Sequence, residues 1–190
     1  MNVSNKFCDS HTQKSTLLTT PQVDFSCLSN LRILVVDDNI DCLYLVTVIF
    51  EDYQAQVKTC RSVDEAIEAI EEWKPNVLIS DICMQGKDGY SLIRSIRLKE
   101  ALNGGFLPAL ALTGYAYPLI RTQALDAGFQ QLILKPFDTD QLVVEVAKLT
   151  QLRYSSTNKK TFFINSVPVI ENYQKVLINT KTIVDCQCRN

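Results

Sequence analysis

The chain has 190 residues, 46% of them hydrophobic, which is enough to bury the core of one domain and leave room for extensions. The 19 lysines and arginines against 21 aspartates and glutamates give a net charge of −2, which argues against a broad surface for nucleic acid or anionic membrane. No apolar run is long enough for a membrane helix and residues 1–20 lack the hydrophobic centre of a secretory signal, so we expect a cytoplasmic protein.

The first part of the chain predicts an extension followed by a strand, a helix and a second strand. Residues 1–30 are rich in polar side chains without a sustained period, and we expect a disordered or loosely attached extension. Leu31–Val36 is an apolar run typical of a strand buried on both faces. Apolar residues at helical spacing predict a helix over Asn39–Phe50, and alternation predicts a strand over Gln56–Cys60.

The middle of the chain continues the alternation of helices and strands. Ser62–Glu65 is a capping box that opens a helix, and Pro75 ends it. Asn76–Ser80 is a short buried strand, followed by the turn pair Asp88-Gly89 and a helix over Tyr90–Lys99.

The last part of the pattern contains two further strands and two further helices. Pro108–Leu112 is the fourth strand, and a helix near Leu119–Ala127 follows. Leu132–Leu134 is the fifth strand, and a capping box at Asp138–Gln141 begins the final helix. The pattern ends near residue 151, so we expect a domain over residues 31–151. Residues 152–190 form an extension without a recognisable domain, and they contain no helix-turn-helix pattern or dense basic helix.

Five strand–helix units in about 120 residues predict an α/β fold, a doubly wound parallel sheet of the flavodoxin-like class with strand order 2-1-3-4-5. In that order the first and third strands are neighbours at the centre of the sheet. We therefore expect Asp37, Asp38 and Asp81, which follow these strands, to converge at one edge.

Three carboxylates in one place repel each other unless a positive group lies among them. Oxygen ligands of this kind suit Mg²⁺, which typically takes one or two carboxylates together with waters and phosphate oxygens. Lys135 at the end of the fifth strand adds a cation, and Thr113 at the end of the fourth adds a hydroxyl. These residue types favour phosphoryl transfer with Asp81 as nucleophile, because metal and lysine neutralise the charge on the transferring oxygens.

Four motifs in chain order make a resemblance specific: Val35–Asn39, Ser80–Met84 with Asp88-Gly89, Ala111–Gly114 and Leu134–Phe137. Together they resemble the receiver domain of two-component response regulators. Each motif alone is a weak signal, but all four fall at the ends of predicted strands. The resemblance covers about residues 31–151.

The resemblance implies that Asp81 accepts a phosphoryl group from a sensor histidine kinase or a histidine phosphotransfer protein. It implies that Thr113 and Lys135 bond phosphoryl oxygens and that the Lys135–Pro136 peptide bond is cis. The ligands it implies for Mg²⁺ are Asp37, Asp38, Asp81 and the backbone carbonyl of Cys83.

The sequence departs from the family pattern at two positions. Gln85 stands where proline is usual, although we expect it to touch no reacting atom. Leu132 stands where an aromatic residue or histidine is usual, which puts the aromatic switch of the family in question. Tyr115 is placed to lean over the pocket and restrict attacking water, so we predict slow self-dephosphorylation.

We interpret the chain as a stand-alone receiver that signals through protein contact with a downstream target, not as an enzyme with its own substrate. A phosphorylation-dependent homodimer is a further option. One alternative is a receiver-shaped scaffold that is never phosphorylated. Another is a phosphatase of the haloacid dehalogenase type, although that family needs two aspartates spaced by one residue, and Asp37 and Asp38 are adjacent. Taken alone, Asp37-Asp38 could be a helix cap and Lys135 a solvated surface cation.

The seven cysteines are scattered and odd in number, which argues against a disulfide framework. The chain has a single histidine, His11, so a zinc site is disfavoured. We expect reduced and mostly buried thiols.

Overall fold

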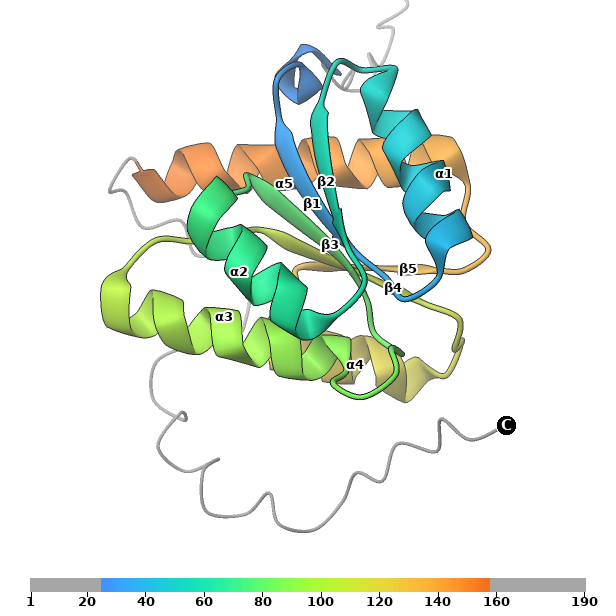
Figure 1. Ribbon diagram of the computed structural model, residues 1–190, viewed down its shortest axis with the longest axis vertical. Coiled ribbons are helices and arrows are strands. Elements are labelled where there is room, and N and C mark those ends of the chain that lie inside the picture. Colours follow the sequence, from blue (N-terminus) through green and yellow to red (C-terminus); the bar gives the residue numbers. More distant parts are fainter. Residues whose placement is uncertain (1–24, 158–190) are drawn as a thin grey trace, which may run out of the picture.

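Five parallel strands form the centre of the molecule, in the order β2-β1-β3-β4-β5 (Figure 1). The computed structural model describes residues 25–157. The strands are β1 (Arg32–Val36), β2 (Gln56–Cys60), β3 (Val77–Asp81), β4 (Ala109–Thr113) and β5 (Gln131–Leu134). The predicted sheet and its strand order are confirmed.

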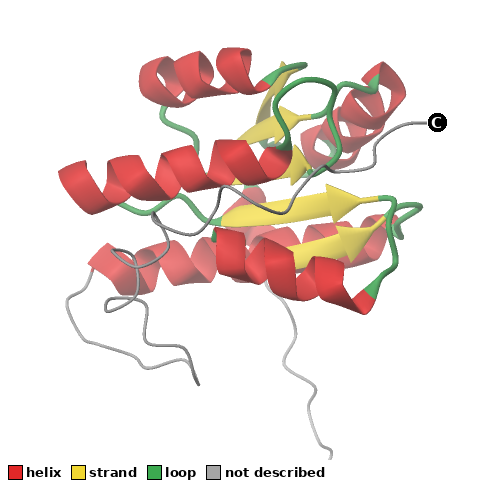
Figure 2. Cartoon of the chain, turned by 90° about the horizontal axis from the view of Figure 1, so that it is seen from below, coloured by secondary structure: helices red, strands yellow, loops and turns green. Residues whose placement is uncertain are grey.

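Helices cover both faces of this sheet (Figure 2). They are α1 (Ile40–Glu51), α2 (Val63–Trp73), α3 (Gly89–Asn103), α4 (Pro118–Ala127) and α5 (Thr139–Thr157). One apolar cluster joins the first face of the sheet to α2, α3 and α4, and a second cluster joins the other face to α1 and α5. The predicted flavodoxin-like arrangement of five helices around the sheet is confirmed.

Alternate side chains of a strand enter opposite clusters, as the pleat of a strand requires. In β1, Leu34 and Val36 join the cluster under α2 and α3, whereas Ile33 and Val35 join the cluster under α1 and α5. All residues of β3 and β4 are buried, because helices cover both faces of these central strands. Burial on both faces explains why the strands read as nearly continuous apolar runs in the sequence.

Side-chain caps fix where two of the helices begin. The Asn39 side chain accepts a hydrogen bond from the N–H of Cys42 at 3.1 Å, and Ser62 Oγ accepts one from the N–H of Glu65 at 3.3 Å. The predicted capping box at Ser62 differs in its second half, since the Glu65 carboxylate accepts from the N–H of Arg61 at 2.8 Å.

Two strands end one residue later than the sequence predicts. β3 ends at Asp81 rather than Ser80, and β4 ends at Thr113 rather than Leu112. The reason is that Asp81 is still paired with Leu112 of β4, and Thr113 with Leu134 of β5. The carboxylate and the hydroxyl are therefore carried by the last rung of the sheet, not by the loops that follow it.

Packed structure also begins before the predicted domain start at Leu31. A single turn of 3₁₀ helix, Phe25–Leu28, lies against the domain, and Leu28 is fully buried in the cluster that contains α1 and α5. At the other end, α5 continues to Thr157, past the predicted boundary at residue 151. The remainder of the two predicted extensions, residues 1–24 and 158–190, lies outside the described residues. Within residues 25–157, no helix combines the length and apolar character that crossing a membrane requires.

Candidate functional site

The carboxyl ends of β1 and β3 bring two acidic residues together. These strands are parallel neighbours in which Val36 is paired with Ser80, so Asp37 and Asp81 follow at the same level of the sheet. Both side chains are almost entirely buried, with relative exposures of 1% and 5%. Two buried carboxylates at one edge need a compensating positive charge.

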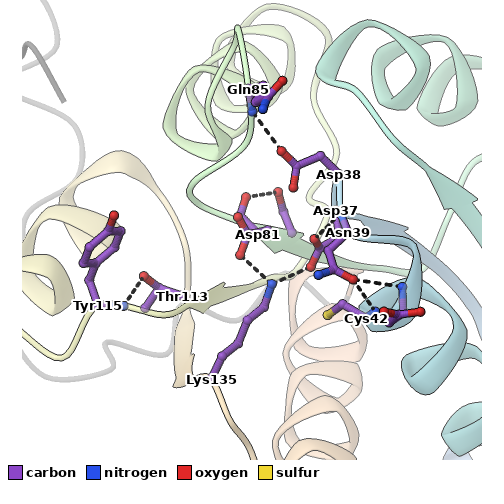
Figure 3. A network of polar contacts seen from close by, with 11 residues as sticks. Asp37, Asp38, Asn39, Cys42, Asp81, Gln85, Thr113, Tyr115 and Lys135 are labelled. Atoms are coloured by element: carbon purple, nitrogen blue, oxygen red, sulfur yellow. Dashed lines mark hydrogen bonds and ion pairs between the residues drawn. The ribbon is translucent and has the colours of Figure 1, made fainter. Parts of the chain in front are cut away.

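Lys135 supplies that charge from the end of β5. Its Nζ atom lies 2.6 Å from Oδ2 of Asp37 and 2.7 Å from Oδ1 of Asp81 (Figure 3). β4 separates β5 from β3 in the sheet, and the long lysine side chain spans this distance. One ammonium group therefore touches both carboxylates, as the sequence predicts for three residues far apart along the chain.

The two partners respond differently to burial. Burial raises the pKa of the Asp81 carboxyl, and the charge of Asp37 adds to this, although the hydrogen bond and positive charge of Lys135 act in the opposite direction. For Lys135, burial alone would lower the pKa of the ammonium, but the hydrogen bonds to Asp37 and Asp81 outweigh it and the pKa rises above its ordinary value. Lys135 therefore remains a cation throughout the physiological pH range.

Asp38 points to a different partner. Its Oδ2 atom accepts a hydrogen bond from the backbone N–H of Gln85 at 3.0 Å, in the loop between β3 and α3 (Figure 3). Asp37 also accepts from the N–H of Asn39, through Oδ1 at 2.9 Å. The structure thus places Asp37 and Asp81 around Lys135, while Asp38 is partly exposed and tied to the loop.

Thr113 lies buried at the end of β4. Its Oγ1 atom accepts a hydrogen bond from the N–H of Tyr115 at 3.2 Å, and its carbonyl accepts one from the N–H of Lys135 at 2.7 Å. Tyr115 is 41% exposed, and its ring stands apart from Asp81 in this structure (Figure 3). The hydroxyl expected at the site is therefore present, but the ring does not cover the carboxylate here.

Sequence reasoning missed Cys42 as a neighbour of the site. Cys42, in the first turn of α1, lies beside Asp37 (Figure 3), and the Asp37 side chain acts on its thiol. Burial raises the pKa of this thiol to about 12, and the hydrogen bond and negative charge of Asp37 contribute to the rise. The sequence held no signal for this contact, because Asp37 lies before the start of α1 and helical spacing does not apply to the pair.

The four cysteines within residues 25–157 form no disulfide. Cys60 is buried, whereas Cys27, Cys42 and Cys83 are only partly buried. The predicted burial of the thiols is therefore complete only for Cys60 within the part of the chain that the structure describes.

A family model for the response regulator receiver domain matches residues 33–147, well over half of the chain. The chain belongs to the response regulator receiver family. The predicted resemblance is confirmed. Asp81 and Thr113 are the last residues of β3 and β4, and Asp37 and Lys135 directly follow β1 and β5, which are the places where the family motifs were expected.

Named relatives of this receiver include regulators and sensor proteins. The chain is 39% identical over 116 residues to an uncharacterized 14.6 kDa protein of Leptolyngbya boryana, covering 61% of this chain and 87% of that protein. It is 34% identical over 122 residues to the sensor protein GacS of Pseudomonas syringae, covering 64% of this chain but 14% of GacS. It is 25% identical over 152 residues to the heme response regulator HssR of Staphylococcus haemolyticus, covering 80% of this chain and 65% of HssR.

Solved receiver structures share the same fold. The receiver domain of Francisella response regulator 1452 superposes with a TM-score of 0.59 at 25% identity, covering 65% of this chain and 98% of that one. Chemotaxis response regulator CheY4 of Vibrio cholerae gives a TM-score of 0.58 at 24% identity, covering 64% of this chain and 99% of that one, which supports the fold alone.

Two smaller expectations concern the loops beside the site. The Lys135–Pro136 peptide bond is cis, as predicted. The Asp81 carboxylate accepts a hydrogen bond from the backbone N–H of Cys83, two residues farther along the chain. The predicted role of the Cys83 carbonyl as a metal ligand stays a prediction.

The chemistry of the donor set fits Mg²⁺, the ion that receiver domains generally bind at this place. Asp37 and Asp81 contact the ammonium group of Lys135, whereas Asp38 contacts a backbone N–H, so the three carboxylates carry an excess of negative charge that a divalent cation would neutralise. As arranged here, however, no group of three or more His, Cys, Asp or Glu side chains within residues 25–157 is gathered into a metal site. The ammonium group of Lys135 neutralises Asp37 and Asp81 where a metal ion would otherwise do so. Asp38 would have to turn inward to bind the same metal ion.

Proposed function

We propose that this receiver is a phosphorylation-controlled binding module in which Asp81 accepts a phosphoryl group from the phosphohistidine of a sensor kinase or phosphotransfer protein. The observation that supports this most strongly is the ammonium of Lys135, held at 2.6 and 2.7 Å between the carboxylates of Asp37 and Asp81. A carboxylate nucleophile and a cation that can move to the incoming group are what such a transfer requires.

In the transfer, an Asp81 oxygen attacks phosphorus and the bond from phosphorus to the histidine nitrogen breaks. The electron pair of that bond returns to the imidazole, and the product is an acyl phosphate on Asp81. Lys135 leaves the Asp81 oxygen that it contacts in this structure and pairs with a phosphoryl oxygen. Asp37, Asp38, Asp81 and the Cys83 carbonyl would hold Mg²⁺, which would supply positive charge to neutralise the phosphoryl oxygens.

Thr113 would carry the signal away from the site. Its hydroxyl oxygen accepts from the N–H of Tyr115 in this structure, and it would turn to donate to a phosphoryl oxygen. The backbone at Tyr115 then loses one hydrogen bond and is released. A change from about 1:99 to 99:1 in favour of the active state requires about 5.5 kcal/mol, a scale that several charge-assisted hydrogen bonds to the phosphoryl group can reach.

The proposed mode of action is contact with a downstream protein target or onward transfer to a histidine phosphotransfer protein. Parts of this chain are similar in sequence to a sensor protein and to a response regulator, which supports a place in a histidine-to-aspartate phosphorelay. We propose a stand-alone cytoplasmic receiver whose only chemistry is its own phosphorylation and slow dephosphorylation, with a homodimer as one form that the phosphorylated state would take.

Intact-mass measurement tests the proposal. The purified chain is incubated with Mg²⁺ and a small acyl phosphate donor, and the same treatment is given to Asp81→Asn. One added phosphate that is absent in Asp81→Asn supports the receiver. Release of phosphate over many turnovers would support a phosphatase instead, and the absence of any adduct would support a scaffold that is never phosphorylated.

A further inference from the structure

The hydrogen bond between Asp38 and Gln85 joins a candidate metal ligand to the β3–α3 loop. Asp38 Oδ2 lies 3.0 Å from the backbone nitrogen of Gln85, while the carboxylates of Asp37 and Asp81 lie around Lys135 (Figure 3). The same loop also contacts Asp81, through the backbone N–H of Cys83, but Asp38 is the acid that lies away from Lys135 and is tied to Gln85. Asp38 is not the reacting carboxylate, so the expectation that Gln85 touches no reacting atom stays a prediction, but the backbone N–H of Gln85 does contact a candidate metal ligand.

The donor in this contact is the backbone N–H of Gln85, so the hydrogen bond requires only that residue 85 has a backbone N–H. Every residue type except proline would provide the same N–H at this position. The Gln85 side chain is exposed and the hydrogen bond does not involve it. The contact can therefore be removed by proline and kept by alanine.

The loop has a second attachment two residues farther on. Lys87 Nζ forms an exposed ion pair with Asp64 Oδ1 in the first turn of α2, at 2.5 Å. Exposed ion pairs of this kind contribute little to stability. The hydrogen bond from Gln85 to the partly exposed Asp38 carboxylate therefore links the part of this loop that follows the Cys83–Asp81 contact to the acidic edge of the sheet.

We propose that the N–H of Gln85 is a positioning group that holds Asp38 outside the cluster around Lys135. A divalent cation at the site draws Asp38 inward, breaks this hydrogen bond and frees the loop at residue 85. The inference rests on the proposed function, since it takes Asp38 as a metal ligand. It adds that this chain binds the cation more weakly than its carboxylates alone would allow, and that cation binding is transmitted to the β3–α3 loop.

Calorimetric titration of Mg²⁺ into three forms of the full chain tests this. Gln85→Pro removes the N–H, and we expect its Kd for Mg²⁺ to fall about five- to tenfold, as for the loss of one competing hydrogen bond to a carboxylate. Gln85→Ala keeps the N–H, and its Kd should equal that of the wild type. Equal affinities in all three forms, or weaker binding by Gln85→Pro, would overturn the inference.

A second comparison separates this effect from stiffening of the loop by proline. In an Asp38→Asn background, Gln85→Pro should no longer change the Kd, because the coupling passes through the Asp38 carboxylate. A tightening that persists in that background overturns the inference. If none of the forms binds Mg²⁺, the proposed metal site is wrong and the inference fails with it. If all forms bind Mg²⁺ but proline does not change the Kd, only the inference about Gln85 fails.

Amide exchange in the wild type provides a measurement that does not depend on the folding of a variant. Addition of Mg²⁺ should speed hydrogen exchange at the Gln85 amide about five- to tenfold, since the amide loses its acceptor. Unchanged or slower exchange at saturating Mg²⁺ would contradict the inference.

Discussion

The Nζ atom of Lys135 lies 2.6 Å from Oδ2 of Asp37, although 98 residues separate the two along the chain. The contact joins the end of β5 to the end of β1 across the carboxyl edge of the sheet. It also brings Lys135 to Asp81, so one cation serves two acids that would otherwise repel each other.

Asp81→Asn should stabilise the folded protein at neutral pH. Burial raises the pKa of Asp81, and a raised pKa means that the group favours folding at acid pH and that this advantage is lost as the pH rises through the folded-state value. Above the folded-state pKa of Asp81, the buried ionised carboxylate lowers the stability of the folded protein. Asparagine carries no charge and avoids this loss. Urea unfolding at pH 7 should show a gain on the order of 1 kcal/mol. The gain should shrink below the ordinary pKa of 3.8, and a less stable Asp81→Asn at pH 7 would contradict this.

Lys135→Met should destabilise the protein by about 2 kcal/mol, less than a fully buried pair would give because Lys135 is partly exposed. The carboxylates raise the pKa of Lys135 above its ordinary 10.5, so its contribution is complete at pH 7 and disappears only at more alkaline pH. In an Asp81→Asn background the loss should be smaller by about 1 kcal/mol. Strictly additive changes in the free energy of unfolding would show that the two residues are not coupled.

Gly89→Ala should disturb the base of the β3–α3 loop. A Cβ atom at Gly89 would lie 2.3 Å from the backbone carbonyl oxygen of Asp81, which is too close for the backbone to tolerate. We expect a loss of about 2 kcal/mol or more in thermal or urea unfolding. Gly114→Ala is the matched control, because nothing lies within 4 Å of its Cβ. Equal stability of the two variants would contradict the close contact.

Cys42 should react slowly with iodoacetamide at pH 7.5, because burial and the neighbouring Asp37 raise the pKa of its thiol to about 12. Asp37→Asn removes the negative charge and should speed alkylation of Cys42 several-fold in a peptide-mapping experiment. Cys60 is an internal control, since burial and Glu65 raise its pKa to about 11 without a contribution from Asp37. A Cys42 rate that does not change in Asp37→Asn would argue against the contact.

Tyr115→Ala should shorten the lifetime of the phosphorylated form by roughly threefold or more, because the ring restricts attacking water. In the structure described here the ring stands apart from Asp81, and it is held near Thr113 through its backbone N–H. Once Thr113 turns to the phosphoryl group, the ring is free to lean over the site. Loss of phosphate is followed by intact mass, with Tyr117→Ala, an exposed tyrosine nearby, as control. Slower decay in Tyr115→Ala would refute the prediction.

The sheet was predictable because its strands are buried on both faces and read as apolar runs between turn signals. The convergence of Asp37, Asp81 and Lys135 followed from strand order, since parallel strands end at the same edge of the sheet. Thr113 was found in the same way. For these residues, position along a strand was sufficient to place the side chain.

Other contacts left no pattern in the sequence. The hydrogen bond from Gln85 to Asp38 uses a backbone N–H as its donor. Every residue type except proline has this group, so the sequence does not show where the bond forms. The packing of Leu28 arises from a single 3₁₀ turn, too short to show a hydrophobic period. The contact between Cys42 and Asp37 depends on the angle at which α1 leaves β1, and a cysteine in a helix is by itself more often a small packing residue.

The most direct measurement for the account is the position of the acyl phosphate. The chain is phosphorylated with Mg²⁺ and a small acyl phosphate donor, reduced with borohydride, and mapped by peptide mass spectrometry. Reduction converts a phosphorylated aspartate to homoserine, and the account predicts homoserine at position 81 alone. Homoserine at position 37 or 38, or at no position, would contradict the claim that Asp81 is the acceptor.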